Sequence, residues 1–161
     1  MRHRRPRRAR LPARDVRCRA LPGDRGHRRA AARAAQGLPP GGARVSVAVA
    51  RVGELKPGET KKFLLQCDGH ELEGFLLYYG GEHHAYVNRC RHVPMGLDWV
   101  ENQFFTEDGR FVQCATHGAY YEPETGECVA GPPCGRTLYR IPLRIEGDAI
   151  IAECPGGLPD E

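Results

Sequence analysis

A chain of 161 residues with a formal net charge of +4 fits one domain around one hydrophobic core, and no apolar run approaches the roughly 20 residues that cross a bilayer. Seven cysteines, an odd number, without a secretion signal argue against a disulfide scaffold and indicate a soluble protein of the reducing cytoplasm, where thiols serve as metal ligands. The charge is unevenly divided, because residues 1–44 hold 14 arginines against two aspartates, whereas residues 45–161 hold 10 basic and 18 acidic side chains.

Residues 1–44 mix Arg, Pro, Gly and Ala without any hydrophobic period. Such a segment buries too little apolar surface to offset the entropy of ordering the chain, so the sequence predicts a disordered tail. Alternatively, the segment is upstream sequence ahead of a true start near Val45, an interpretation that we favour over any specific function. A third interpretation is an arginine-rich arm that binds phosphate, although nucleic acid is not an expected partner.

Residues 45–155 show the period of β-strands, beginning with the alternating stretch 46–52. Turn signals separate apolar runs at Asp68-Gly69, at Gly80-Gly81 and at Gly147, which predicts three hairpins. No segment carries an apolar stripe at helical spacing over three turns. We therefore expect an all-β, antiparallel domain over residues 45–155, followed by a short C-terminal tail at 156–161.

Two short motifs carry the chemistry of this domain. Cys90-Arg91-His92 is followed, after 21 residues, by Cys114-Ala115-Thr116-His117, so each motif offers one thiolate and one imidazole. Zinc sites more often pair cysteines as C-x2-C, and a C-x-H motif is uncommon among them. A Rieske 2Fe-2S centre needs two cysteines on one iron and two histidines on the other, which two such motifs supply.

The flanking residues extend this match, and residues 47–153 resemble the soluble Rieske ferredoxins and Rieske-domain proteins of bacteria. The segments that carry the resemblance are Cys90-Arg91-His92-Val93-Pro94, Cys114-Ala115-Thr116-His117-Gly118 and Gly126-Glu127-Cys128-Val129-Ala130-Gly131-Pro132-Pro133. The resemblance implies a Rieske-like antiparallel β-sandwich with a small cluster-binding subdomain, formed by two ligand loops and a proline loop. It also implies one 2Fe-2S cluster held by Cys90, His92, Cys114 and His117. A longer insert between the motifs, and Cys134 after the proline loop, leave the subfamily open.

This ligand set makes the oxidised site electrically neutral, since two ferric ions, two sulfides and two thiolates carry charges that cancel. Adding an electron is therefore easier than in a four-cysteine cluster, and Rieske potentials span about −150 to +300 mV. High-potential relatives resemble one another in having a serine where this chain has Ala119. We therefore expect a midpoint potential in the lower part of that range, about −150 to 0 mV. Of the neighbouring pair Tyr120 and Tyr121, which alternate faces of a strand, Tyr121 is the better candidate for a hydrogen bond near the cluster.

The remaining cysteines show no ligand pattern. Cys128 and Cys134 are interpreted as small buried hydrophobic residues, and no role is readable for Cys18, Cys67 or Cys154. High-potential relatives carry a disulfide at positions that resemble Met95 and Thr116, so that bond cannot exist here.

Three aromatic side chains outside the motifs are also interpreted as structural. His83 and His84 are expected to lie exposed on a hairpin, and Trp99 is expected to pack in the core or against the cluster loops.

The resemblance implies a one-electron carrier, a soluble ferredoxin serving an oxygenase or reductase, with a flavin reductase as the other partner. The alternative is a tightly bound Rieske subunit of a multi-component oxidoreductase, such as the small subunit of a nitrite reductase. A complete oxygenase needs two further histidines and a carboxylate, yet no histidine follows His117. We therefore expect no catalytic residues and no membrane contact, and a non-redox interaction module would be favoured only if the cluster failed to assemble.

Overall fold

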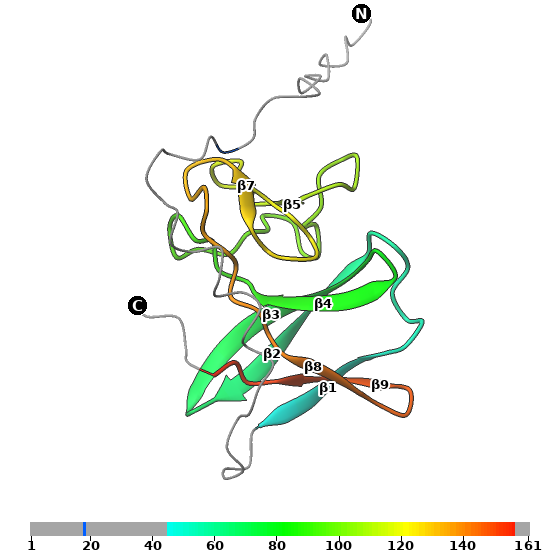
Figure 1. Ribbon diagram of the computed structural model, residues 1–161. Helices are drawn as coiled ribbons and strands as arrows, with labels where there is room; N and C mark the ends of the chain where they lie inside the picture. Colours follow the sequence, from blue (N-terminus) through cyan, green and yellow to red (C-terminus); the bar gives the residue numbers. More distant parts are fainter. Residues whose placement is uncertain (1–17, 19–44, 157–161) are drawn as a thin grey trace, which may run out of the picture.

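The computed structural model describes Cys18 and residues 45–156, and every regular element in this part of the chain is a β-strand (Figure 1). Within that part, no helix is long and apolar enough to cross a membrane. The expectation of an all-β antiparallel domain is confirmed. The strands are β1 Ser46–Arg51, β2 Thr60–Cys67, β3 His70–Tyr79, β4 Glu82–Val87, β5 Val112–Gln113, β6 Tyr120–Tyr121, β7 Cys128–Ala130, β8 Leu143–Glu146 and β9 Ala149–Glu153.

These strands form three antiparallel sheets of three strands each, in the orders β1-β9-β8, β2-β3-β4 and β5-β6-β7. The predicted hairpins β2–β3, β3–β4 and β8–β9 are all present. Asp68 and Gly69 join the first pair with φ angles of 51° and 82°, and Gly80 and Gly81 join the second with 62° and 88°. Two successive residues with positive φ match the right-handed twist of the flanking strands, which explains the Asp-Gly and Gly-Gly signals.

The central sheet β2-β3-β4 lies between two hydrophobic cores, because side chains along β3 alternate between its faces. Leu76 faces the core shared with β1-β9-β8, whereas Phe75 and Leu77 belong to the core of a smaller subdomain. That subdomain comprises residues 88–138 and contains the sheet β5-β6-β7, seen above β4 in Figure 1. The fold therefore consists of a two-sheet base and a small subdomain built on its outer face.

Aromatic side chains join the subdomain to the base. Phe75 of β3 stacks on Phe104 of the insert, with ring centroids 4.0 Å apart and planes only 8° from parallel. Tyr86 of β4 donates its hydroxyl hydrogen to the carbonyl oxygen of Pro123 at 2.9 Å. These rings are buried, so the apolar contact that holds the subdomain is made directly by the central sheet.

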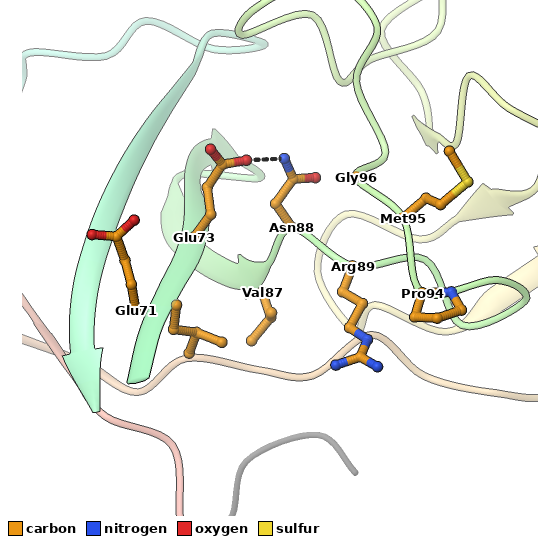
Figure 2. A pocket seen from close by; sticks show the side chains of 9 residues that line it. Glu71, Glu73, Val87, Asn88, Arg89, Pro94, Met95 and Gly96 are labelled. Carbon is orange, nitrogen blue, oxygen red and sulfur yellow. Dashed lines mark hydrogen bonds between the residues drawn. The ribbon is translucent and has the colours of Figure 1, made fainter. Parts of the chain in front are cut away.

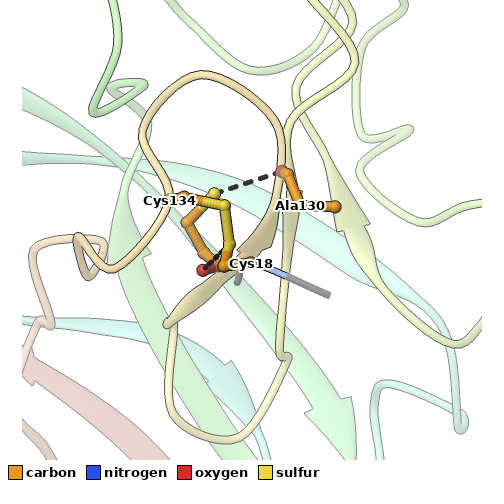
Figure 3. Close-up of a disulfide and its surroundings, with 4 residues drawn as sticks. Cys18, Ala130 and Cys134 are labelled. Carbon is orange, nitrogen blue, oxygen red and sulfur yellow. Dashed lines mark hydrogen bonds between the residues drawn. A yellow bond between two sulfur atoms is a disulfide. The ribbon is translucent and has the colours of Figure 1, made fainter. Parts of the chain in front are cut away.

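Two disulfides are present, although the odd cysteine count argued against a disulfide scaffold. Cys67 at the end of β2 bonds Cys154, just after β9, and so links the two sheets of the base. Cys18 bonds Cys134 in the loop after β7 (Figure 3). The paired cysteines are 87 and 116 residues apart, a separation at which spacing along the sequence carries no information about proximity.

Cys18 also lies along β7, where its backbone N–H donates to the carbonyl oxygen of Val129 at 2.8 Å. The sequence offered no sign of this contact. The other residues of 1–44, with the disorder expected of them, lie outside the described residues, as do residues 157–161.

His84 is buried rather than exposed, so the expectation for this side chain was wrong. It lies on β4, where Arg140 donates a guanidinium hydrogen to its Nδ1 atom at 3.0 Å and another to the carbonyl oxygen of Glu124 at 2.7 Å. His83 is half-buried beside Tyr78. Burial, and then the neighbouring charge of Arg140, lower the pKa of His84 below its ordinary value of 6.5.

This arrangement predicts a loss of stability on mild acidification. The unfolded chain protonates His84 at about pH 6.5, whereas the folded protein keeps this side chain neutral to a lower pH. The stabilisation that comes from a neutral His84 is therefore complete above about pH 6.5 and is lost as pH falls toward the lower pKa of the folded state. Urea unfolding at about pH 7.5 and about pH 5.5 should show a smaller pH effect in His84→Gln, which keeps an acceptor for Arg140. The exposed His70 provides the control, since His70→Gln should retain the wild-type pH effect.

Candidate metal centre

Two loops of the small subdomain present the predicted ligand residues. Loop 1 comprises residues 89–97 after β4, and loop 2 comprises residues 114–119 between β5 and β6. Each loop is closed by its own backbone, because Cys90 N–H donates to the carbonyl of Met95 at 2.8 Å and Cys114 N–H donates to that of Ala119 at 2.9 Å. Ala115 N–H donates to the carbonyl of Leu97 at 2.8 Å, which joins one loop to the other.

The two cysteines lie together in the interior of the subdomain, where Cys90 is 6% exposed and Cys114 is fully buried. The neighbouring Cys114 thiol, and then Tyr121 and backbone N–H groups, hold the pKa of Cys90 well below its ordinary value. The neighbouring Cys90 and burial raise the pKa of Cys114. Each of the two sulfurs therefore affects the protonation of the other.

The two histidines form a second pair at the surface. The Nδ1 atoms of His92 and His117 lie 3.3 Å apart, and both side chains are exposed. Among the described residues, no three or more His, Cys, Asp or Glu side chains surround a point where a single ion could bind. The four donors are arranged as a thiol pair and an imidazole pair, which fits a two-iron cluster with a different ligand type at each iron.

Tyr121 contacts the thiol pair as the sequence analysis expected. Its hydroxyl oxygen lies 3.4 Å from the sulfur of Cys90 and accepts a hydrogen bond from the backbone N–H of Arg91 at 3.2 Å. Burial, and then the hydrogen bond with Cys90, raise the pKa of this phenol. Tyr121 therefore stays protonated and can donate to the sulfur, while Tyr120 is more exposed.

The proline loop, residues 131–135, lies against loop 2 at Gly131. A side-chain carbon at this position would lie 2.8 Å from the Cα atom of Ala119, and Gly131 has a φ of +104°. Both the space and the backbone conformation require glycine. The close approach places the proline loop directly against the loop that carries Cys114 and His117.

Sequence reasoning placed two other side chains wrongly. Trp99 is 73% exposed instead of packing in the core or on the loops, and Cys134 is an exposed disulfide partner instead of a buried hydrophobic residue. Cys128 is buried as expected, and its thiol donates to the carbonyl of Ala130 at 3.2 Å. The exposure of Trp99 depends on how the insert between the two ligand motifs packs against β2, and no short sequence pattern predicts that packing.

The family model of the Rieske [2Fe-2S] domain matches residues 45–145, more than half of the chain. The chain belongs to this family. Its cofactor is accordingly a Rieske-type 2Fe-2S cluster, and the resemblance found in the sequence motifs is confirmed. The paired thiols and paired imidazoles are the donor set that such a cluster requires.

Ferredoxins of dioxygenase systems are among the proteins to which this Rieske protein is similar. It is 28% identical over 102 residues to the biphenyl dioxygenase ferredoxin subunit of Pseudomonas sp. (strain KKS102), an alignment that covers 63% of this chain and 85% of that protein. The ferredoxin of carbazole 1,9a-dioxygenase from Nocardioides aromaticivorans IC177 is 26% identical, with a TM-score of 0.52, over 67% of this chain and 96% of that one. A complex of reduced oxygenase and oxidized ferredoxin in carbazole 1,9a-dioxygenase shares the fold, with 19% identity, a TM-score of 0.55 and coverage of 71% and 98%.

Proposed function

We propose that this protein is a free ferredoxin that carries single electrons to the oxygenase component of a dioxygenase system. We further propose that Cys90, His92, Cys114 and His117 hold its cluster. The observation that carries the proposal is a buried thiol pair and an exposed imidazole pair on the same two loops, in a domain that aligns with almost the whole length of a ferredoxin. When bound, a Rieske cluster supplies the gain and loss of one electron.

The chain's own residues would support this task by binding and orientation. Cys90 and Cys114 supply thiolates shielded from water, and Tyr121 donates a hydrogen bond to one of these sulfurs. The exposed rings of His92 and His117 form the edge that a partner protein can approach. Since their Nδ1 atoms face each other, the Nε2 atoms are the ring nitrogens left to form a hydrogen bond with a partner.

The expected partners follow from the relatives and from charge. The ferredoxins that align with this chain are named as components of biphenyl and carbazole dioxygenase systems, which supports a terminal oxygenase as the electron acceptor. A flavin reductase is the proposed electron donor. Residues 45–161 carry 10 basic and 18 acidic side chains, so a basic partner surface would accelerate encounter at low ionic strength.

Anaerobic purification followed by metal and sulfide analysis tests this proposal. We expect a red-brown protein with two irons and two sulfides per chain. The protein should be reduced by a flavin reductase with NADH and reoxidised by an oxygenase component, at rates that fall as salt rises. One zinc per chain without sulfide would contradict the cluster, and turnover of an organic substrate by the isolated chain would contradict a carrier.

Tyr121→Phe is expected to lower the midpoint potential, because the lost hydroxyl donor stabilises the more negative, reduced cluster. Protein-film voltammetry measures this shift, and Tyr120→Phe on the neighbouring strand position is the matched control. Ala119→Ser should change the potential in the opposite direction, if the added hydroxyl donates to the cluster. An unchanged potential in Tyr121→Phe would show that this phenol does not donate to the reduced cluster.

A further inference from the structure

Asn88 lies between the base and loop 1, just after β4 and two residues before Cys90, with a side chain that is 8% exposed. All of its side-chain hydrogen-bonding groups are used. Its Nδ2 atom donates to Glu73 at 2.5 Å, the bond drawn in Figure 2, and to Asp98 at 2.8 Å. Its Oδ1 atom accepts the backbone N–H of Leu97 at 2.8 Å.

These contacts require the functional group of asparagine. Two carboxylates need two donors, and the amide of Leu97 needs an acceptor, on a side chain short enough to fit between β3 and loop 1. An aspartate at position 88 would place a third carboxylate against Glu73 and Asp98.

The bonds of Asn88 continue in both directions. Toward the base, its backbone N–H donates to the carbonyl of Glu73 at 2.8 Å. Toward the cluster site, the backbone N–H of Leu97 donates to Oδ1 of Asn88, and the carbonyl oxygen of Leu97 accepts the N–H of Ala115 in loop 2 at 2.8 Å. A continuous path of hydrogen bonds therefore runs from β3 through Asn88 to both ligand loops.

A salt bridge completes the path and balances its charge. The ammonium group of Lys62 on β2 lies 3.2 Å from the carboxylate of Asp98 and 3.5 Å from that of Glu73. The Asp98 side chain is only 5% exposed, so its charge needs both the Lys62 cation and the Asn88 donor. Breaking one of these contacts leaves a carboxylate partly unsatisfied beside loop 1.

We propose that Asn88 is a positioning residue for the cluster, which holds loop 1 and loop 2 at a fixed place on the base. The inference rests on the proposed ligand set, because the two loops matter to the cluster only if they bind it. The Asn88 amide acts through Leu97 and its partner Ala115 and is not itself one of the proposed ligands. Its loss broadens the range of ligand geometries, which changes the electronic environment of the irons.

The test compares Asn88→Ala with Gln66→Ala in the full-length protein carrying its cluster. Gln66 makes a similar amide–carboxylate bond, to Glu71 at 3.1 Å, on the exposed β2–β3 hairpin, and neither residue belongs to a ligand loop. In Asn88→Ala we expect iron release to a chelator about 10-fold faster, the equivalent of losing one hydrogen bond to a charged group. We also expect broader EPR lines of the reduced protein and a shifted midpoint potential. Gln66→Ala should behave as wild type in all three measurements.

A rescue variant separates positioning from a general loss of stability. Asn88→Asp should show the defects of Asn88→Ala, whereas the double variant Asn88→Asp with Asp98→Asn restores a donor–acceptor pair between positions 88 and 98. The double variant should regain part of the EPR sharpness and chelator resistance, because the contact between positions 88 and 98 is restored while the new carboxylate still faces Glu73. Rescue would not be expected if position 88 merely filled space.

The outcomes distinguish this inference from the proposed function. If the wild-type protein assembles no iron–sulfur cluster, the proposed function fails. If the wild type assembles the cluster and Asn88→Ala matches it in EPR line width, potential and iron release, the positioning role alone is overturned. The same result follows if the double variant is no better than Asn88→Asp.

Discussion

Replacing Cys114 with serine is expected to abolish the visible absorption and the iron content of the purified protein. The thiol is fully buried beside Cys90, so no solvent ligand can readily replace it. A serine hydroxyl stays protonated at neutral pH and is a hard oxygen donor, which suits iron–sulfur ligation poorly. Iron and sulfide assays with circular dichroism in the visible range measure the loss.

Cys128 supplies the matched control for this substitution. It is another buried, free cysteine in the same hydrophobic cluster, but its thiol donates to the carbonyl of Ala130 and is not one of the proposed ligands. Cys128→Ser should keep two irons per chain. Full iron and sulfide content in Cys114→Ser would disprove the ligand assignment.

Phe104→Ala is expected to reduce the free energy of unfolding by about 3–5 kcal/mol, the usual cost of removing a buried aromatic ring. The ring is 1% exposed and stacks on Phe75, so its loss leaves a cavity where the small subdomain meets the central sheet. Denaturant unfolding with fluorescence detection measures the change. The cluster should also be lost at lower denaturant concentration, because both ligand loops belong to this subdomain.

The control is Phe111→Ala, which truncates a half-buried ring that stacks on Tyr120 with centroids 5.9 Å apart. Phe111→Ala should reduce the free energy of unfolding clearly less than Phe104→Ala does, since less buried apolar surface is removed. Equal losses of stability in the two variants would show that the Phe75–Phe104 contact is not what holds the subdomain on the base.

Local chemistry explains which features could be predicted. The turn at Asp68-Gly69 needs two positive φ angles, and few residues other than glycine, asparagine and aspartate adopt them, so the hairpin is encoded in the dipeptide. The donor types of Cys90-Arg91-His92 and of the second motif likewise follow from the cluster's chemistry. Such requirements can be predicted from a short stretch of sequence, because each one concerns atoms that are close together along the chain.

The sequence alone thus determined the class of fold, the hairpins, the two ligand motifs and the family to which they belong. Only the tertiary structure decided that Cys67 bonds Cys154, that Trp99 is exposed and that His84 is buried. It also decided that Asn88 joins β3 to both ligand loops. The physical reason is that each of these features depends on which distant segments come into contact, and spacing along the chain does not record distance in space once the strands have packed.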